Sequence, residues 1–149
     1  MGIRARRLQE NGMPATYTID RENRWVHTML WGTVSRADML SMIDRALHEA
    51  EFDASFAEIV DLTEVIKMEL SGDDMLEIAQ NNFFSAHSRR AIVVPDDNHV
   101  VGLAEMYETL RATQGETGLR IFRTLDEALN WVARREARSQ DGADRRDPD

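Results

Sequence analysis

The stretch Arg89-Arg90-Ala91-Ile92-Val93-Val94-Pro95 decides the expected fold of this chain. Its four consecutive apolar residues favour a strand that is covered on both faces, and such strands usually lie inside a parallel sheet. Pro95 ends the strand because proline donates no backbone hydrogen bond to a neighbouring strand. Asp96 and Asp97 follow and can cap a helix that begins near Asn98. The stretch therefore predicts one strand–turn–helix unit of an α/β domain.

The segments that precede this stretch predict a hairpin and a further helix and strand. Residues 16–20 alternate polar and apolar side chains, as a half-covered edge strand does. Residues 24–34 carry apolar side chains on both faces, which is typical of a central strand. The short connection between the two predicts an antiparallel hairpin. A helix capped by Ser35 is expected over 36–50, and the next strand over 56–62.

The rest of the chain repeats this unit, with one ambiguous segment. Residues 63–70 fit either a packed loop or a short extra strand. A second helix is expected to begin at Ser71, with Leu76, Ala79 and Phe83 on its buried side. The remaining elements are a helix over about 98–113, a strand over 119–123 and a helix that begins near Leu125.

This order of elements predicts an α/β fold with a mixed sheet of about five strands and about four flanking helices. The opening hairpin is antiparallel, whereas the last three strands are joined through helices and should run parallel. At 149 residues the chain is expected to form one domain, over residues 14–137. Residues 1–13 are expected to be a disordered basic arm, with Met13 as an alternative start, and residues 138–149 a disordered polar tail.

Composition argues against several classes of function. The chain has no cysteine, so it holds neither a disulfide nor a thiolate site, and we expect a cytoplasmic location. The formal net charge of −9 argues against generic binding of nucleic acid or of an anionic membrane. No apolar run approaches the about 20 residues that a membrane-spanning helix needs. The sequence has no Gly-rich phosphate loop, nucleophile elbow or zinc-spaced pair, and we expect no cofactor or metal.

Short motifs distributed over about residues 16–133 resemble those of a known family. They are Trp31-Gly32-Thr33-Val34, Phe56 with Ile59-Val60-Asp61-Leu62, the stretch 89–95, Gly102-Leu103-Ala104 with Met106-Tyr107, Ile121-Phe122-Arg123, and Asp126-Glu127-Ala128-Leu129-Asn130-Trp131. Together they resemble the SpoIIAA-like family, which belongs with the STAS and SEC14-like domains. The resemblance implies a mixed sheet flanked by helices and, for most members, no assigned enzyme activity.

The same resemblance implies two kinds of partner. The STAS relatives are protein-interaction modules of anti-sigma antagonism and transporter regulation, and the SEC14 relatives bind lipids. STAS antagonists carry a phosphorylatable serine in an Asp-Ser-x-Gly turn, and the matching turn here is Glu69-Leu70-Ser71-Gly72. Leu70 occupies the phosphoacceptor position, so we interpret Ser71 as a helix cap in preference to a phosphorylation site.

A small set of polar residues follows the predicted parallel strands. Ligands of open parallel sheets favour the carboxyl ends of the strands. Those ends supply Asp61 and Thr63, and then Asp96, Asp97 and His99. The last three could ligate a metal or carry out acid–base chemistry, but the preferred interpretation is that the aspartates cap a helix and that His99 is exposed in its first turn.

Methionines and aromatic residues are more numerous than a small core needs. Most of them are expected in the core, and the remainder could line an apolar groove for a lipid-like ligand or a partner. Phe83 and Phe84 are the pair expected to be exposed, because adjacent helix residues cannot both face inward. His27 stands among tryptophans in its strand and is interpreted as a core or interface histidine.

Three functions are compatible with these observations. The leading hypothesis is a non-enzymatic regulatory or protein-interaction domain, as a homodimer or with an unknown protein partner. The second is a carrier for a small apolar ligand or a lipid. The third is a small hydrolase that uses Asp96, Asp97 and His99.

Overall fold

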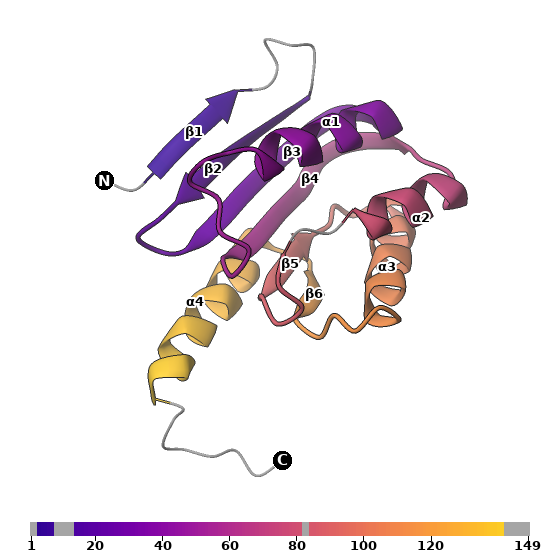
Figure 1. Cartoon of the computed structure of the whole chain (residues 1–149). Coiled ribbons are helices and arrows are strands. Elements are labelled where there is room, and N and C mark those ends of the chain that lie inside the picture. Colours follow the sequence, from indigo (N-terminus) through magenta and orange to yellow (C-terminus); the bar gives the residue numbers. More distant parts are fainter. Residues whose placement is uncertain (1–2, 8–13, 82–83, 142–149) are drawn as a thin grey trace.

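The computed structural model describes residues 3–7, 14–81 and 84–141, which form one mixed sheet with helices on both faces (Figure 1). The strands are β1 (Ile3–Arg7), β2 (Ala15–Asp20), β3 (Trp25–Ser35), β4 (Ala57–Glu69), β5 (Arg90–Val93) and β6 (Leu119–Phe122). The helices are α1 (Arg36–Leu47), α2 (Gly72–Gln80), α3 (Asn98–Ala112) and α4 (Leu125–Asp141). In Figure 1, α4 lies apart from the other three helices.

The strands stand in the sheet in the order in which they occur in the chain. β1 pairs antiparallel with β2, and β2 pairs antiparallel with β3. From β3 to β6 every neighbouring pair is parallel. The predicted hairpin, the predicted parallel strands and the mixed α/β sheet are therefore confirmed.

Strand β5 lies between β4 and β6, as its apolar composition predicts. Its alternate side chains enter two separate cores, because successive residues of a strand point to opposite faces. Ile92 and Val94 belong to the core beneath α1, α2 and α3. Ala91 and Val93 belong to a smaller core that also contains Trp131 of α4. Burial on both faces explains why this strand carries a continuous apolar run rather than an alternating one.

The ambiguous segment 63–70 continues strand β4 as far as Glu69. β3 pairs with β4 along its whole length, with register shifts between Met29 and Trp31 and between Gly32 and Thr33. Gly32 has a φ of 68°, a backbone conformation that favours glycine, at this irregularity. The two long strands therefore extend beyond β5, and their ends pack beneath the helices through Val34 and Met68.

Three expectations at the edges of the domain differ from the structure. Residues Ile3–Arg7 of the expected disordered arm form strand β1, which covers β2, so β2 is not the edge strand that its alternation suggested. Helix α4 continues to Asp141, past the expected start of the polar tail. Residues 1–2, 8–13 and 142–149 lie outside the described residues.

The helix starts follow the predicted capping residues. Ser35 and Ser71 each accept a hydrogen bond from the backbone of the third helical residue, Asp38 and Asp74 respectively, whose side chain accepts in return. These reciprocal pairs are capping boxes. The predicted buried face of α2 is wrong at Leu76, which is 45% exposed. The buried side of α2 instead consists of Met75, Ile78 and Ala79, which recur at helical spacing.

Candidate ligand cavity and its buried ion network

An apolar cavity of about 100 Å³ lies between the sheet and the helices α1, α2 and α3. Strands β3, β4 and β5 form one wall, and the three helices form the other. The apolar side chains that line it include Met39, Met42, Met68, Met75, Ile78 and Leu103. Methionine is flexible and polarizable, so a wall with four methionines can adapt to occupants of different shape.

One end of the cavity is polar because Glu58 of β4 and Arg90 of β5 line it. The two residues are direct partners in the parallel register of these strands. Arg90 Nε donates a hydrogen bond to Glu58 Oε1 at 2.9 Å, and both residues are buried. Arg90 shares its face of β5 with Ile92, so it points toward the side of α1, α2 and α3.

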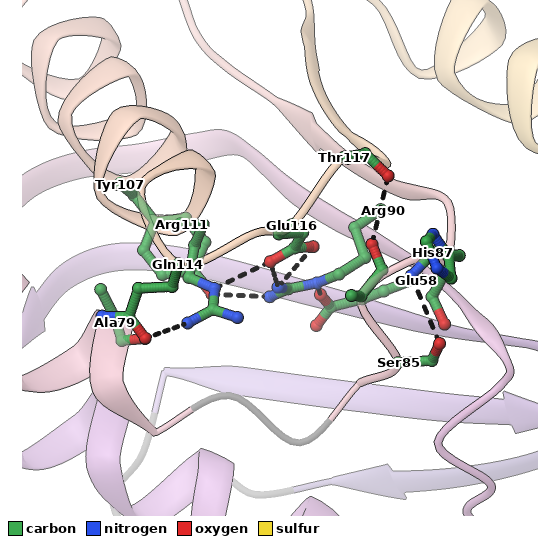
Figure 2. A network of polar contacts seen from close by, with 12 residues as sticks. Glu58, Ala79, Ser85, His87, Arg90, Tyr107, Arg111, Gln114, Glu116 and Thr117 are labelled. Carbon is green, nitrogen blue, oxygen red and sulfur yellow. Dashed lines mark hydrogen bonds and ion pairs between the residues drawn. The ribbon is translucent and has the colours of Figure 1, made fainter.

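Glu116 joins this pair from the turn between α3 and β6 (Figure 2). Arg90 Nη1 donates to both carboxylate oxygens of Glu116, at 2.9 and 3.0 Å. Arg111 Nε of α3 donates to Glu116 Oε1 at 2.8 Å, so the carboxylate lies between two guanidinium groups. Gly115, with a φ of 95°, lets the chain reverse immediately before Glu116.

Arg111 also ties this network to the end of helix α2. Its Nη1 donates to the backbone carbonyl of Ala79 at 2.7 Å. The carbonyl groups in the last turn of a helix lack partners within the helix, so a buried guanidinium is a favourable donor there. The network therefore connects β4, β5, α3 and the end of α2 at one side of the cavity.

Tyr107 of α3 completes the polar end. Arg90 Nη2 donates to the Tyr107 hydroxyl oxygen at 2.7 Å. The Arg90 guanidinium lies 5.0 Å from the ring centroid of Phe84 and 5.5 Å from that of Tyr107, within the range of cation–π attraction. Burial raises the pKa of Tyr107, although the Arg90 charge opposes this, so the phenol stays protonated at neutral pH.

The charges of the network cancel. Burial by itself lowers the pKa of Arg90, but attraction to the Glu58 and Glu116 carboxylates and the hydrogen bond to Tyr107 outweigh it, so the pKa lies above its ordinary value. Two guanidinium groups, from Arg90 and Arg111, thus face two carboxylates, from Glu58 and Glu116. A buried charge without a partner is costly, and this arrangement leaves none of the four uncompensated.

The polar site residues that the sequence suggested, Asp61, Thr63, Asp96, Asp97 and His99, do not line the cavity. Asp61 Oδ1 accepts from the backbone N–H and the hydroxyl of Thr63 within strand β4, where the pairing with β3 is irregular. Asp97 caps α3, Asp96 is exposed, and exposed His99 places its Nε2 3.3 Å from the backbone carbonyl of Met68. No hydrogen bond or ion pair joins these side chains into one cluster in the described part of the chain.

The interpretation of Phe84 as an exposed residue is wrong. Phe84 is 5% exposed and lines the cavity, where its ring also makes an edge contact with Phe52. The expectation assumed that residues 83 and 84 lie on one helix, whereas α2 ends at Gln80. Phe83 lies outside the described residues, so its predicted exposure stays a prediction.

The opposite face of the sheet carries His27 and two tryptophans of β3. Burial lowers the pKa of His27, and the nearby Asp61 charge opposes this only in part. Within the described ranges, His27 Nε2 is a buried polar atom without a hydrogen-bond partner. Trp25 packs against the core beneath α4, whereas half-buried Met29 and Trp31 belong to neither core cluster.

The four members of the ion network were not identified from the sequence. One signal was available for Arg90, because a strand residue two places before a buried isoleucine shares its face. Glu116 lies in a segment that the sequence identifies only as a glycine-bounded turn, and Arg111 occupies the last turn of a helix, where arginine is common on the surface. Their burial depends on contacts between residues far apart in the chain.

Two further features are absent among residues 3–7, 14–81 and 84–141. No group of three or more histidine, aspartate or glutamate side chains there is arranged to hold a metal ion. No helix in this part of the chain has both the length and the apolar character needed to cross a bilayer.

Comparison with known proteins finds a likeness in three dimensions. The crystal structure of an uncharacterised DUF3478-family protein with a SpoIIAA-like fold, from Shewanella loihica PV-4, covers 87% of this chain and 91% of its own. The two chains are 17% identical, and the TM-score is 0.47. No family model and no curated protein matches the sequence.

Proposed function

We propose that this protein binds a small apolar molecule in the cavity beneath α1, α2 and α3, without chemical conversion of it. The observation that supports this most directly is an apolar cavity beside an ion network whose charges are already paired. Ligand pockets combine a mostly apolar wall with a few well-placed polar groups, and this cavity has both. Its volume of about 100 Å³ suits a molecule no larger than about one small ring, since a cavity of about 150 Å³ can hold benzene.

Native mass spectrometry after gentle purification is the first test of this proposal. A bound ligand would appear as additional mass on the folded protein that is lost after denaturation. A protein purified without its ligand should still bind added benzene, which can be measured from the chemical shifts of the methionine methyl groups. The proposal would be contradicted if the protein carried no ligand and these methyl signals did not respond to benzene.

A pair of variants on one helix locates the binding. Ala104 of α3 lines the cavity, whereas Ala112 at the end of the same helix is exposed. Ala104→Leu adds three carbon atoms to the wall and should weaken benzene binding by about tenfold or more, because it occupies the space that the ligand needs. Ala112→Leu, the matched control, should leave the affinity unchanged. Equal affinities for the two variants would place the ligand elsewhere.

A second candidate function is a protein-interaction domain that forms a homodimer. Met29 and Trp31 are half-buried apolar residues of β3, on the face where α4 contacts β4, β5 and β6. Half-buried apolar side chains on this face that belong to neither core cluster of the described chain are typical of a contact surface. The second function therefore uses the opposite face of the sheet from the cavity.

Light scattering tests the dimer directly. The protein should have the mass of two chains, and Trp31→Glu should convert it to a monomer because a charge cannot be buried in the contact without a partner. Leu76→Glu is the control, since Leu76 is a 45% exposed apolar residue of α2, a helix that packs on the other face of the sheet. A monomeric mass for the unaltered protein at high concentration would contradict the dimer.

A further inference from the structure

We infer that the ligand of this cavity is uncharged and places one hydrogen-bond acceptor, such as a ketone or ester oxygen, at the Tyr107 hydroxyl. This inference rests on the proposed function and specifies the chemical class of the ligand. Two observations support it independently: the balance of charge around the polar end, and the hydrogen-bonding state of Tyr107.

The balance of charge argues against a charged ligand. Arg90 is the cationic side chain among the cavity-lining residues, and both Glu58 and Glu116 already neutralise it. A ligand carboxylate would bring an additional negative charge to carboxylates that are nearly inaccessible to solvent. A ligand ammonium would add a positive charge beside two buried guanidinium groups. Either ion would have to lose its hydration without gaining a free counter-charge.

Tyr107 offers the donor that an uncharged ligand can use. Its hydroxyl oxygen accepts a hydrogen bond from Arg90 Nη2 at 2.7 Å, and the residue lines the cavity. A phenol has one hydrogen to donate, and within the described residues that hydrogen has no acceptor. The bond from a charged guanidinium polarises the hydroxyl and strengthens its capacity as a donor. A ligand oxygen at this position would receive the unused hydrogen.

The rest of the wall favours a compact apolar body attached to that oxygen. The methionines beyond the polar end offer contacts without a directional requirement, so they select for size and apolar surface. The network thus fixes the orientation of the ligand, and the methionine wall accommodates its shape.

The test compares four probes with the same five-membered ring: cyclopentane, cyclopentanone, cyclopentanecarboxylate and cyclopentylammonium. We expect the two uncharged probes to bind and the two ions to bind at least tenfold more weakly than cyclopentanone. Tyr107→Phe should lower the ratio of ketone affinity to hydrocarbon affinity by about fivefold, the typical net effect of one hydrogen bond. Unchanged cyclopentane affinity in this variant shows that the cavity is intact.

An infrared measurement on the unaltered protein provides a test that does not depend on the variant. The carbonyl band of bound cyclopentanone should lie at lower frequency than in an apolar solvent, because the oxygen accepts a hydrogen bond. An unshifted band, an unchanged affinity ratio in Tyr107→Phe, or tighter binding of either ion would overturn the inference while leaving the proposed function in place. Failure of both uncharged probes to bind would instead contradict the proposed function itself.

Discussion

Replacement of Glu116 by glutamine tests whether the buried ion network stabilises the fold. The Glu116 side chain has no exposure to solvent and accepts hydrogen bonds from both Arg90 and Arg111. Glu116→Gln keeps the shape but removes one negative charge, which leaves two buried guanidinium groups facing one carboxylate. It also places an amide N–H₂ beside a guanidinium donor, where no hydrogen bond can form.

The expected magnitude follows from burial. Removal of one partner from a buried ion pair costs about 3–5 kcal/mol, because the remaining charge is uncompensated. The amide oxygen of glutamine still accepts one hydrogen bond, so we expect a loss near the lower limit, about 3 kcal/mol in the free energy of unfolding. In a domain of this size each kcal/mol corresponds to about 2–4 °C, so the melting temperature should fall by about 6–12 °C.

Urea unfolding, followed by the fluorescence of the tryptophans, measures this change. The midpoint should fall while the slope with urea stays constant, since the surface exposed on unfolding is the same. Glu77→Gln is the matched control, because Glu77 accepts two hydrogen bonds from Arg36 at similar distances but the pair is exposed. Solvent screens such a pair, so the control should change stability little. Equal losses in the two variants would refute the role assigned to burial.

Three further outcomes can be checked by equilibrium unfolding. Gly118→Ala should lower the free energy of unfolding by about 1–3 kcal/mol, because the added Cβ would collide with the backbone carbonyl of Ser88. Gly102→Ala, on the exposed side of α3, should raise it by about 0.5–1 kcal/mol, and reversed signs would contradict this reasoning. The free energy of unfolding should fall as the pH drops from 7.5 through 6.5, because burial lowers the pKa of His27 in the folded state and the unfolded chain binds the proton first. An equal pH dependence in His27→Gln would show that another group causes it. Ser71→Ala should cost about 1 kcal/mol through the loss of its cap, and no loss would argue against the capping role.

The fold could be predicted largely from local patterns. The apolar run at 91–94, the alternation in 16–20 and the capping residues before the helices identify the elements, and the helical connections make the last three strands parallel. The extension of β4 was ambiguous because its apolar residues follow no simple period across the irregular pairing with β3. Strand β1 was missed because its pairing depends on β2 rather than on its own composition.

The cavity and its ion network depend on tertiary structure, for a physical reason. Backbone preferences and the period of apolar residues act over a few neighbours, so the order of amino acids alone identifies which segments are strands and helices. The burial of the charged residues depends on the assembled sheet. Glu58 and Arg90 lie side by side because β4 and β5 pair in parallel register, and the turn after α3 places Glu116 against Arg90. A charged side chain is tolerated in a core only beside its counter-charge, and these partners are 26 and 32 residues apart in the chain.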